Sequence, residues 1–259
     1  MAHIELPTGF PGIAGPLACV GSLTVRTMTS ADEAPAIDAV VLAFVADPVA
    51  RWSWPHSHQY LASMPSFIRA FGGNAFTHGS AYCTDGYAGA ALWLPPGVPP
   101  DEEMLGEIVC RTVSASTRGD VFAVLEQAAK YHPAQPHWYL PCIGVDPVHQ
   151  GKGHGDALMT YALQHCDRDQ VPAYLESTNP RNVSLYRRHG FEVLGTIQVG
   201  SSPPLIPMLR SPRRERGAAA ERPQAACRKA ASRLSHSPMR FQLANVRLTI
   251  RSKRVARFR

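Results

Sequence analysis

The chain has 259 residues, of which 45% are hydrophobic, so it is long enough and apolar enough to bury a substantial core. Its formal net charge of +6 is unevenly placed, because residues 211–259 carry 14 basic and 2 acidic side chains, whereas residues 1–210 carry 12 basic and 18 acidic ones. The excess of basic residues that could bind nucleic acid is therefore restricted to the last fifth of the chain. The six cysteines form no CxxC pair, which argues against a metal site or a disulfide framework and fits a reducing cytoplasm.

The first segment, 1–21, is rich in glycine and proline and is expected to be a loosely ordered lead. It has no basic region followed by an apolar core, so it does not resemble a signal peptide. The longest apolar stretch, 36–46, is far shorter than the ~20 residues that span a bilayer. These features predict a soluble, cytoplasmic protein without a membrane partner.

Residues 22–210 carry the hydrophobic periodicities of a folded α/β domain. Asp85-Gly86 joins two of its strands as a hairpin turn would, and the aromatic-rich segment 51–73 is of the kind that lines a pocket. The predicted elements are a strand over 22–28, a helix over 34–45, strands over 81–84 and 86–94, helices over 101–111 and 120–130, a strand over 138–145, a helix over 156–166, a strand over 173–177, a helix over 182–189, and strands over 191–199 and 205–210. This order predicts a mixed α/β sheet.

The stretch 138–158 reads WYLPCIGVDPVHQGKGHGDAL, which is an apolar strand, an Asp-Pro turn, a loop with three glycines and the start of a helix. Glycines let a backbone approach a ligand closely, and the N–H groups at a helix start favour an anion, so we expect a phosphate group here. A P-loop fails because Gly153 follows the lysine where a hydroxyl is needed. A dinucleotide fingerprint is a weak match because the glycines run as GxGxG. The third interpretation is the pattern Gln/Arg-x-x-Gly-x-Gly/Ala, which Gln150, Gly153 and Gly155 satisfy.

A second motif, YLESTNPRNVSLYRRHGF over 174–191, follows the loop. The two motifs in this order resemble the signatures of the GNAT superfamily of acetyl-CoA-dependent N-acetyltransferases, and are most similar to the puromycin N-acetyltransferase branch. The resemblance covers roughly 22–210 and implies a mixed, mostly antiparallel sheet flanked by helices. It also implies direct transfer of an acetyl group from acetyl-CoA to the primary amine of a small molecule, such as an aminonucleoside, by a monomer or homodimer that needs no metal.

The resemblance implies a CoA site built mainly from backbone. Ile143, Gly144 and Val145 would pair with the pantetheine arm and offer an N–H to the oxyanion, and a glycine within a strand indicates a bulge or a close backbone approach. The pyrophosphate would be bound by Gln150, Gly151, Lys152, Gly153, His154, Gly155 and Asp156. His154 departs from the aliphatic residue usual in the family, and we interpret it as a tolerated surface variant. Asn182 would touch CoA or anchor a helix start, and a plain cap is the alternative.

Tyr186 matches the family's general acid, which protonates the departing CoA thiolate. Phenols titrate near pH 10, so this one is protonated at neutral pH and can donate. An isolated tyrosine on a short helix would more often be a packing residue, but its position four residues after Asn182 and five before Phe191 favours catalysis. Glu176 is the best candidate base, with a solvated residue or an ion-pair partner as the alternatives.

The acceptor site should come from the first half of the chain, where aromatic residues could stack on a flat or apolar amine. The candidates, each of which could equally be a core residue, are Trp52, Trp54, His56, Tyr60 and Trp93. Cys142 is most simply a buried strand residue.

The segment 211–259 is rich in Arg, Ala, Ser and Pro and shows no bulky apolar period until its end, so we expect a disordered basic tail. An alternative hypothesis is a nucleic-acid-associated protein in which this tail grips phosphates and the domain is an acyl-CoA sensor or a protein acetyltransferase. The tail lacks interleaved aromatic residues, so nucleic-acid binding is the less favoured hypothesis.

Overall fold

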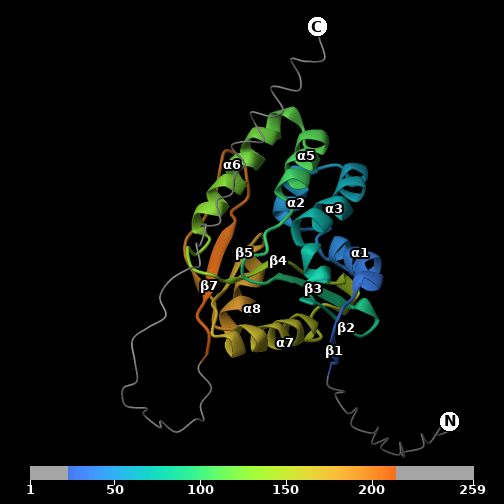
Figure 1. The fold of residues 1–259 in the computed structure, drawn as a ribbon. Coiled ribbons are helices and arrows are strands. Elements are labelled where there is room, and N and C mark those ends of the chain that lie inside the picture. Colours follow the sequence, from blue (N-terminus) through green and yellow to red (C-terminus); the bar gives the residue numbers. More distant parts are fainter. Residues whose placement is uncertain (1–22, 214–259) are drawn as a thin grey trace, which may run out of the picture.

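The protein is described here by a computed structural model over residues 23–213; the predicted lead 1–21 and the predicted tail beyond residue 213 lie outside these residues. Figure 1 shows a central sheet with helices on both faces. Its strands are β1 Val25–Thr27, β2 Ala81–Thr84, β3 Gly89–Leu94, β4 Trp138–Val145, β5 Ala173–Ser177, β6 Glu192–Val193 and β7 Ile206–Arg210. They are ordered β1-β2-β3-β4-β5-β7-β6, with β4 and β5 parallel and the other neighbours antiparallel. The predicted mixed, mostly antiparallel sheet is thus confirmed.

The helices form two layers. They are α1 Glu33–Ala43, α2 Pro48–Ser53, α3 Ser57–Gly72, α4 Asn74–Thr77, α5 Glu102–Thr112, α6 Ala115–Tyr131, α7 His154–Asp169 and α8 Val183–Arg188. Helices α1 and α3 pack on β3 and β4, with α5 and α6 beyond them, while α7 covers the opposite face together with α8 (Figure 1). Within the described part of the chain, no helix combines the length and the apolar character that crossing a membrane requires.

Successive side chains of a strand point to opposite faces of a sheet, and this alternation divides the core in two. Leu92 and Leu94 of β3 belong to the core beneath α1 and α3. Trp93, between them, belongs to the core beneath α7. Tyr174 of β5 lies on the α1 side and Leu175 on the α7 side. Only every second side chain of these strands can therefore line a site on the α1 side of the sheet.

Several boundaries differ from the sequence prediction. Helix α6 begins at Ala115, five residues early, because the Ser114 hydroxyl caps it by accepting from the N–H of Thr117 at 3.2 Å. The strand predicted over 191–199 is reduced to β6, followed by a single bridge at Ile197. The described chain also continues three residues past 210, where the N–H of Arg213 donates to Asp167 at 2.7 Å.

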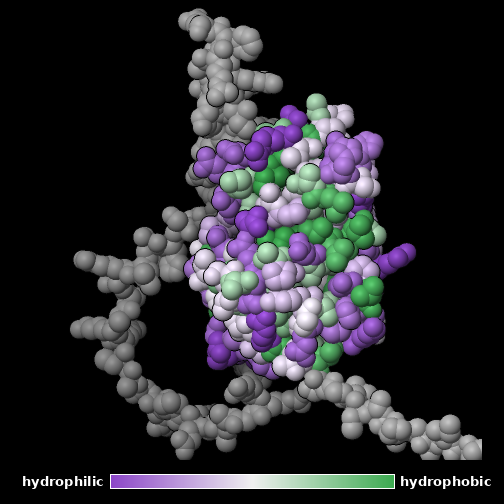
Figure 2. Space-filling model, turned by 90° about the vertical axis from the view of Figure 1, so that its right-hand side faces the viewer, coloured by the Kyte–Doolittle hydropathy of each residue, from purple (hydrophilic) through white to green (hydrophobic). Residues whose placement is uncertain are grey.

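The outer surface shows no large uniform patch on the face presented in Figure 2. Hydrophilic and hydrophobic residues are interspersed there, with the hydrophobic ones gathered towards the middle and upper half. The exposed large hydrophobic residues of the described chain include Leu42 of α1 and Leu61 of α3. Isolated exposed apolar residues are normal on soluble proteins and need no partner.

Candidate active site

The two parallel strands at the centre of the sheet separate part of the way along their length. Pairing between β4 and β5 ends at Leu140 and Leu175. The next residue of β4 is Pro141, which has no N–H to continue the ladder. On its other side β4 remains paired with β3 as far as Val145 and Gly89, with a register irregularity between Leu92 and Leu94. Among the described strands none pairs with residues 141–145 on the β5 side, so this backbone edge can receive an extended ligand arm.

The glycine loop follows the end of β4. Gly151 and Gly153 have φ angles of 75° and 91°, in the left-handed region that favours glycine. Gly153 is also the residue from which α7 begins. The first N–H groups of a helix have no partner within it, and they carry the positive end of its dipole. The loop therefore offers donors to an anion beside the open edge of β4, and phosphate binding there stays a prediction.

Gly144 is required by helix packing and lies within a paired part of the strand. A Cβ atom placed there would lie 2.6 Å from the Cβ of Ala43 and 3.2 Å from the Cα of Val40. Of the two predicted explanations, a bulge or a close backbone approach, the close approach of α1 holds. Ala43 and Gly144 together set how near α1 lies to β4.

Several side chains of the loop are turned away from solvent or held by neighbours. His154 is 7% exposed and its Nδ1 lies 2.9 Å from the hydroxyl of Thr84. Burial, with help from His149 and Lys152, lowers the pKa of His154, so the ring is neutral near pH 7. The interpretation of His154 as a surface variant is therefore wrong: its side chain is part of the support beneath the loop.

Three further predicted CoA residues have side chains with partners in the protein. Gln150 donates from Nε2 to the carbonyl of Val145 at 3.0 Å, which closes the loop onto the end of β4. Lys152 donates to the carbonyl of Val148 at 2.9 Å, and Asp156 pairs with His189 at 2.9 Å. All three side chains are exposed and keep further hydrogen-bonding groups, so they remain available to a ligand beside the backbone of the loop.

Asn182 is exposed and helical, and it forms no side-chain cap to α8. The capping side chain here belongs to Asn179, whose Oδ1 accepts from the N–H of Arg181 at 3.1 Å. The alternative interpretation of Asn182 as a cap is therefore wrong, and its amide faces solvent.

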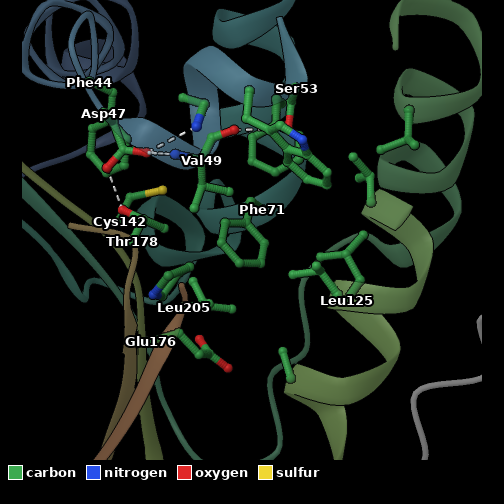
Figure 3. A pocket seen from close by; sticks show the side chains of 18 of the residues that line it. Phe44, Asp47, Val49, Ser53, Phe71, Leu125, Cys142, Glu176, Thr178 and Leu205 are labelled. Atoms are coloured by element: carbon green, nitrogen blue, oxygen red, sulfur yellow. Dashed lines mark hydrogen bonds between the residues drawn. The ribbon is translucent and has the colours of Figure 1, made fainter. Parts of the chain in front are cut away.

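A pocket lies on the α1 side of the sheet. Its walls are mostly apolar and come from α2, α3, α5, α6, β4 and Leu205. Figure 3 shows Asp47, Cys142 and Thr178 at one end and Glu176 apart from them, with Phe71 and Leu125 along the walls. Burial of an apolar ligand with a few polar contacts is what such a pocket allows.

Glu176 is the acidic group at one end of this pocket. It follows Tyr174 by two residues on β5, so both point to the α1 side. The Tyr139 hydroxyl donates to Oε2 at 2.8 Å. His132 Nε2 lies 3.2 Å from Oε1 in an ion-pair contact that is not an aligned hydrogen bond, which leaves Oε1 able to accept from a ligand. Of the predicted alternatives, a solvated residue is excluded because the Glu176 side chain is 7% exposed.

Asp47 is the second acidic group of the pocket, and neither of the two sequence motifs contains it. Its Oδ1 accepts from the N–H groups of Val49 and Ala50, both at 3.0 Å, and its Oδ2 accepts from the Thr178 hydroxyl at 2.5 Å. Burial raises the pKa of Asp47, against the effect of these hydrogen bonds. The available sequence signal was an Asp at the N-cap with Pro at the first helical position.

Tyr186 lies on α8 near the Asp47 end of the pocket. It is 5% exposed and packs edge-on against Phe191, with ring centroids 6.2 Å apart. Burial raises its pKa well above 10, and the charges of Asp47 and Cys142 act in the same direction. The phenol is therefore protonated at neutral pH, as a proton donor must be.

The structure brings two of the five acceptor candidates to the pocket. Trp52 and Trp54 line it, and their indole N–H groups donate outward to Ser201 and Thr112. The other three lie elsewhere. His56 is exposed and stacks on His58, Tyr60 is buried and donates to the carbonyl of Val41, and Trp93 faces α7 because its neighbours Leu92 and Leu94 take the α1 side.

Residues 76–191 match the family model for the acetyltransferase (GNAT) family. An uncharacterised N-acetyltransferase of Schizosaccharomyces pombe is 34% identical over 99 residues, which are 37% of this chain and 40% of that protein. A mycothiol acetyltransferase of Saccharomonospora viridis is 36% identical over 77 residues, 26% of this chain and 25% of that protein. The chain thus spans well under half the length of these curated relatives.

Solved structures give a longer match. The Corynebacterium glutamicum protein named histone acetyltransferase HPA2 and related acetyltransferase has 27% identity and a TM-score of 0.55, with 75% of this chain and 99% of that chain covered. Arylalkylamine N-acetyltransferase 2 from Aedes aegypti has 14% identity and a TM-score of 0.52, with 73% and 99% covered, and it shows the fold alone. Residues 76–191 are thus similar to the acetyltransferase (GNAT) family, and the solved structures share the fold of this chain.

Proposed function

We propose that the protein is an acetyl-CoA-dependent N-acetyltransferase that moves the acetyl group directly to a primary amine of a small molecule. The observation that carries the proposal is the arrangement of the separated strands β4 and β5, with the glycine loop at one end and a buried carboxylate in an apolar pocket beside them. A CoA arm on the free edge of residues 141–145 would point its thioester at this pocket. An ammonium group entering the pocket would meet Glu176.

Direct transfer is supported by the state of the cysteine nearest the site. Cys142 is 4% exposed, and burial raises the pKa of its thiol to about 12. A thiol with such a pKa is a poor nucleophile at neutral pH. An acetyl-enzyme on Cys142 is therefore not part of the proposed mechanism. Glu176 takes a proton from the amine, a backbone N–H of residues 142–145 faces the oxyanion, and Tyr186 protonates the CoA thiolate.

The pocket favours an amine carried on an apolar or aromatic body. Its walls contain Trp52, Trp54, Phe67 and Phe71, which offer flat apolar surface. A second charged group on the ligand would be buried there at a large free-energy cost unless it were paired. Together with the motif resemblance, this makes puromycin or a related aminonucleoside the first acceptor to test. Arylalkylamines are the second class, because a structural neighbour carries that name.

The proposal is tested by CoA release and by acetyl-CoA binding. We expect phenethylamine and puromycin to be acetylated with a higher kcat/KM than agmatine, whose guanidinium would be buried in the pocket. Gly153→Glu should weaken acetyl-CoA binding by about tenfold or more, because it introduces a strained backbone at a φ of 91° and a negative charge beside the phosphates. Titration calorimetry measures this loss.

The matched control is Gly97→Glu. Gly97 has a φ of 84° and open space around it, and it follows β3 at the end opposite the loop. It reproduces the strain and the added charge, and should leave acetyl-CoA affinity unchanged. Intact binding in Gly153→Glu, or no binding by the unaltered chain at high micromolar acetyl-CoA, would show that the proposal is wrong.

A further inference from the structure

A polar pair, Asp47 and Thr178, interrupts the apolar wall of the pocket and has no task in the proposed acetyl transfer. The Thr178 hydroxyl donates to Asp47 Oδ2 at 2.5 Å, and Asp47 Oδ1 accepts from the N–H groups of Val49 and Ala50. Asp47 is 7% exposed, and both members of the pair line the pocket (Figure 3). Polar groups placed in an otherwise apolar pocket are the ones that orient a ligand.

The pair has hydrogen-bonding capacity left for a ligand. A carboxylate oxygen accepts up to two hydrogen bonds, and so does a hydroxyl oxygen. Among the described residues, Thr178 is the one donor to Asp47 Oδ2, and no group donates to Thr178 Oγ1. A donor on a ligand can therefore bind here without breaking a hydrogen bond that already exists.

A neutral hydroxyl fits this pair better than a second ammonium group does. If Asp47 is ionised, a ligand hydroxyl donates to Oδ2 or to Thr178 Oγ1. If Asp47 is protonated, its O–H donates to Thr178, whose own hydrogen is then free to bind the ligand oxygen. A hydroxyl accepts as well as donates, whereas an ammonium only donates and would add a second buried charge. A hydroxyl therefore fits in both states of Asp47.

The spacing of the polar positions limits where this hydroxyl lies on the acceptor. Thr178 follows Glu176 by two residues, directly after the end of β5, and both line the pocket on the α1 side of the sheet. Residues two apart in an extended chain are about 6.5–7 Å from each other. An amine hydrogen-bonded to Glu176 and a hydroxyl hydrogen-bonded to Thr178 are then separated by about two or three carbon atoms.

Resting on the proposed acetyl transfer, we propose that the acceptor is an amino alcohol whose hydroxyl binds to Asp47 and Thr178 while its amine meets Glu176. The hydroxyl does not react. It holds the nitrogen in place for attack on the thioester at the free edge of residues 141–145. Thr178 is then a specificity-determining residue, and Asp47 is a positioning residue that orients the Thr178 hydroxyl. The gain is limited, because the pair keeps its own hydrogen bond when no ligand hydroxyl is bound.

Three related amines test the proposal on the unaltered full chain. In 2-amino-1-phenylethanol two carbons separate the hydroxyl from the nitrogen, phenethylamine has no hydroxyl, and tyramine has one at the far end of its ring. In assays of CoA release, kcat/KM for 2-amino-1-phenylethanol should exceed that for phenethylamine by about tenfold, the effect of one added hydrogen bond. One enantiomer should account for this gain, and tyramine should not show it. Equal values for 2-amino-1-phenylethanol and phenethylamine, or the same gain with tyramine, would overturn the proposal.

Substitution of Thr178 tests whether this residue is responsible for the gain. Thr178→Val keeps the branched shape without the hydroxyl, so the ratio of the two kcat/KM values should fall to about one. Thr178→Ser keeps the hydroxyl, serves as the matched control and should retain most of the ratio. Because the ratio compares two amines on one protein, a general loss of stability or rate does not change it. A ratio that survives in Thr178→Val would contradict the role of this residue.

Failure of this proposal and failure of the proposed function give different results. If the unaltered protein acetylates phenethylamine and 2-amino-1-phenylethanol equally well, the function stands and the hydroxyl site is wrong. If it neither binds acetyl-CoA nor acetylates any amine, the proposed function is wrong and the hydroxyl site falls with it.

Discussion

In the proposed mechanism, protonation of the CoA thiolate depends on the Tyr186 hydroxyl. Burial and the nearby charges of Asp47 and Cys142 keep its pKa well above 10. The donor form is therefore present throughout neutral and mildly alkaline solution, and is lost only as the pH rises through that raised pKa. We expect Tyr186→Phe to lower kcat by about 100-fold with little change in the KM for acetyl-CoA, as steady-state kinetics would show. The kcat of the unaltered protein should not fall between about pH 7 and about pH 9 because of this group.

Tyr161→Phe on α7 is the matched control, since its ring packs against Tyr82 with centroids 5.1 Å apart and it does not line the pocket. Its kcat should be unchanged. Full activity in Tyr186→Phe would contradict the role, and so would an alkaline loss of kcat below about pH 9 that Tyr186→Phe abolishes.

At the scale of elements, the approach of α1 to β4 is fixed by Gly144. Gly144→Ala places a methyl group 2.6 Å from the Cβ of Ala43, so α1 must shift or the strand must bend. Overpacking of this kind costs about 1–3 kcal/mol, and thermal unfolding should show a melting temperature lower by several degrees. Ala43→Gly in the same chain should restore most of the loss, because it removes the other methyl group.

Gly119→Ala in α6 serves as the control for this change, because a Cβ there meets open space. Alanine is favoured over glycine within a helix by about 0.5–1 kcal/mol, so this variant should gain stability. A Gly144→Ala protein as stable as the unaltered one, or one that Ala43→Gly destabilises further, would contradict the packing argument.

Elements set by local chemistry were predictable from the sequence, and those set by distant contacts were not. The hairpin at Asp85-Gly86, the strand 173–177 and the left-handed glycines of the loop depend on residues adjacent in the chain. The strand predicted over 191–199 ends at Val193 instead, and Gly195 beyond it lies against α6, with the Tyr131 hydroxyl 2.6 Å from where a Cβ would lie. The Asp47 end of the pocket was missed for the same reason, since Asp47 meets Thr178 across 131 positions of sequence.

Aromatic content alone could not place the acceptor site either. Trp93 was as good a candidate as Trp54 until the direction of each side chain was known. A shift of one position along β3 exchanges the pocket face for the α7 face. No sequence motif marks His132, which contacts Glu176 in the structure.

For the molecule as a whole, the basic charge of residues beyond 213 bears on two hypotheses. Either this segment is an appendage to the acetyltransferase domain, or it binds nucleic acid. The chain up to Arg213 is tied to α7, where the carbonyl of Arg213 accepts from Gln170 at 3.1 Å and its N–H donates to Asp167. Shortening the chain to end at Arg213 should therefore preserve both the melting temperature and the kcat for the amine. It removes most of the 14 basic side chains of 211–259, so any binding to DNA should disappear.

In the full chain, binding that rests on these basic side chains should weaken steeply with salt, by about one counterion for each phosphate contact. A filter-binding or anisotropy titration at two salt concentrations measures this slope beside the acetyl-transfer rate. If the shortened chain keeps its melting temperature but loses acetyl transfer, the segment beyond 213 takes part in the site. If the full chain binds DNA tightly at physiological salt and the shortened chain does not, this result would support nucleic-acid binding by the segment beyond 213, in addition to acetyl transfer by the domain.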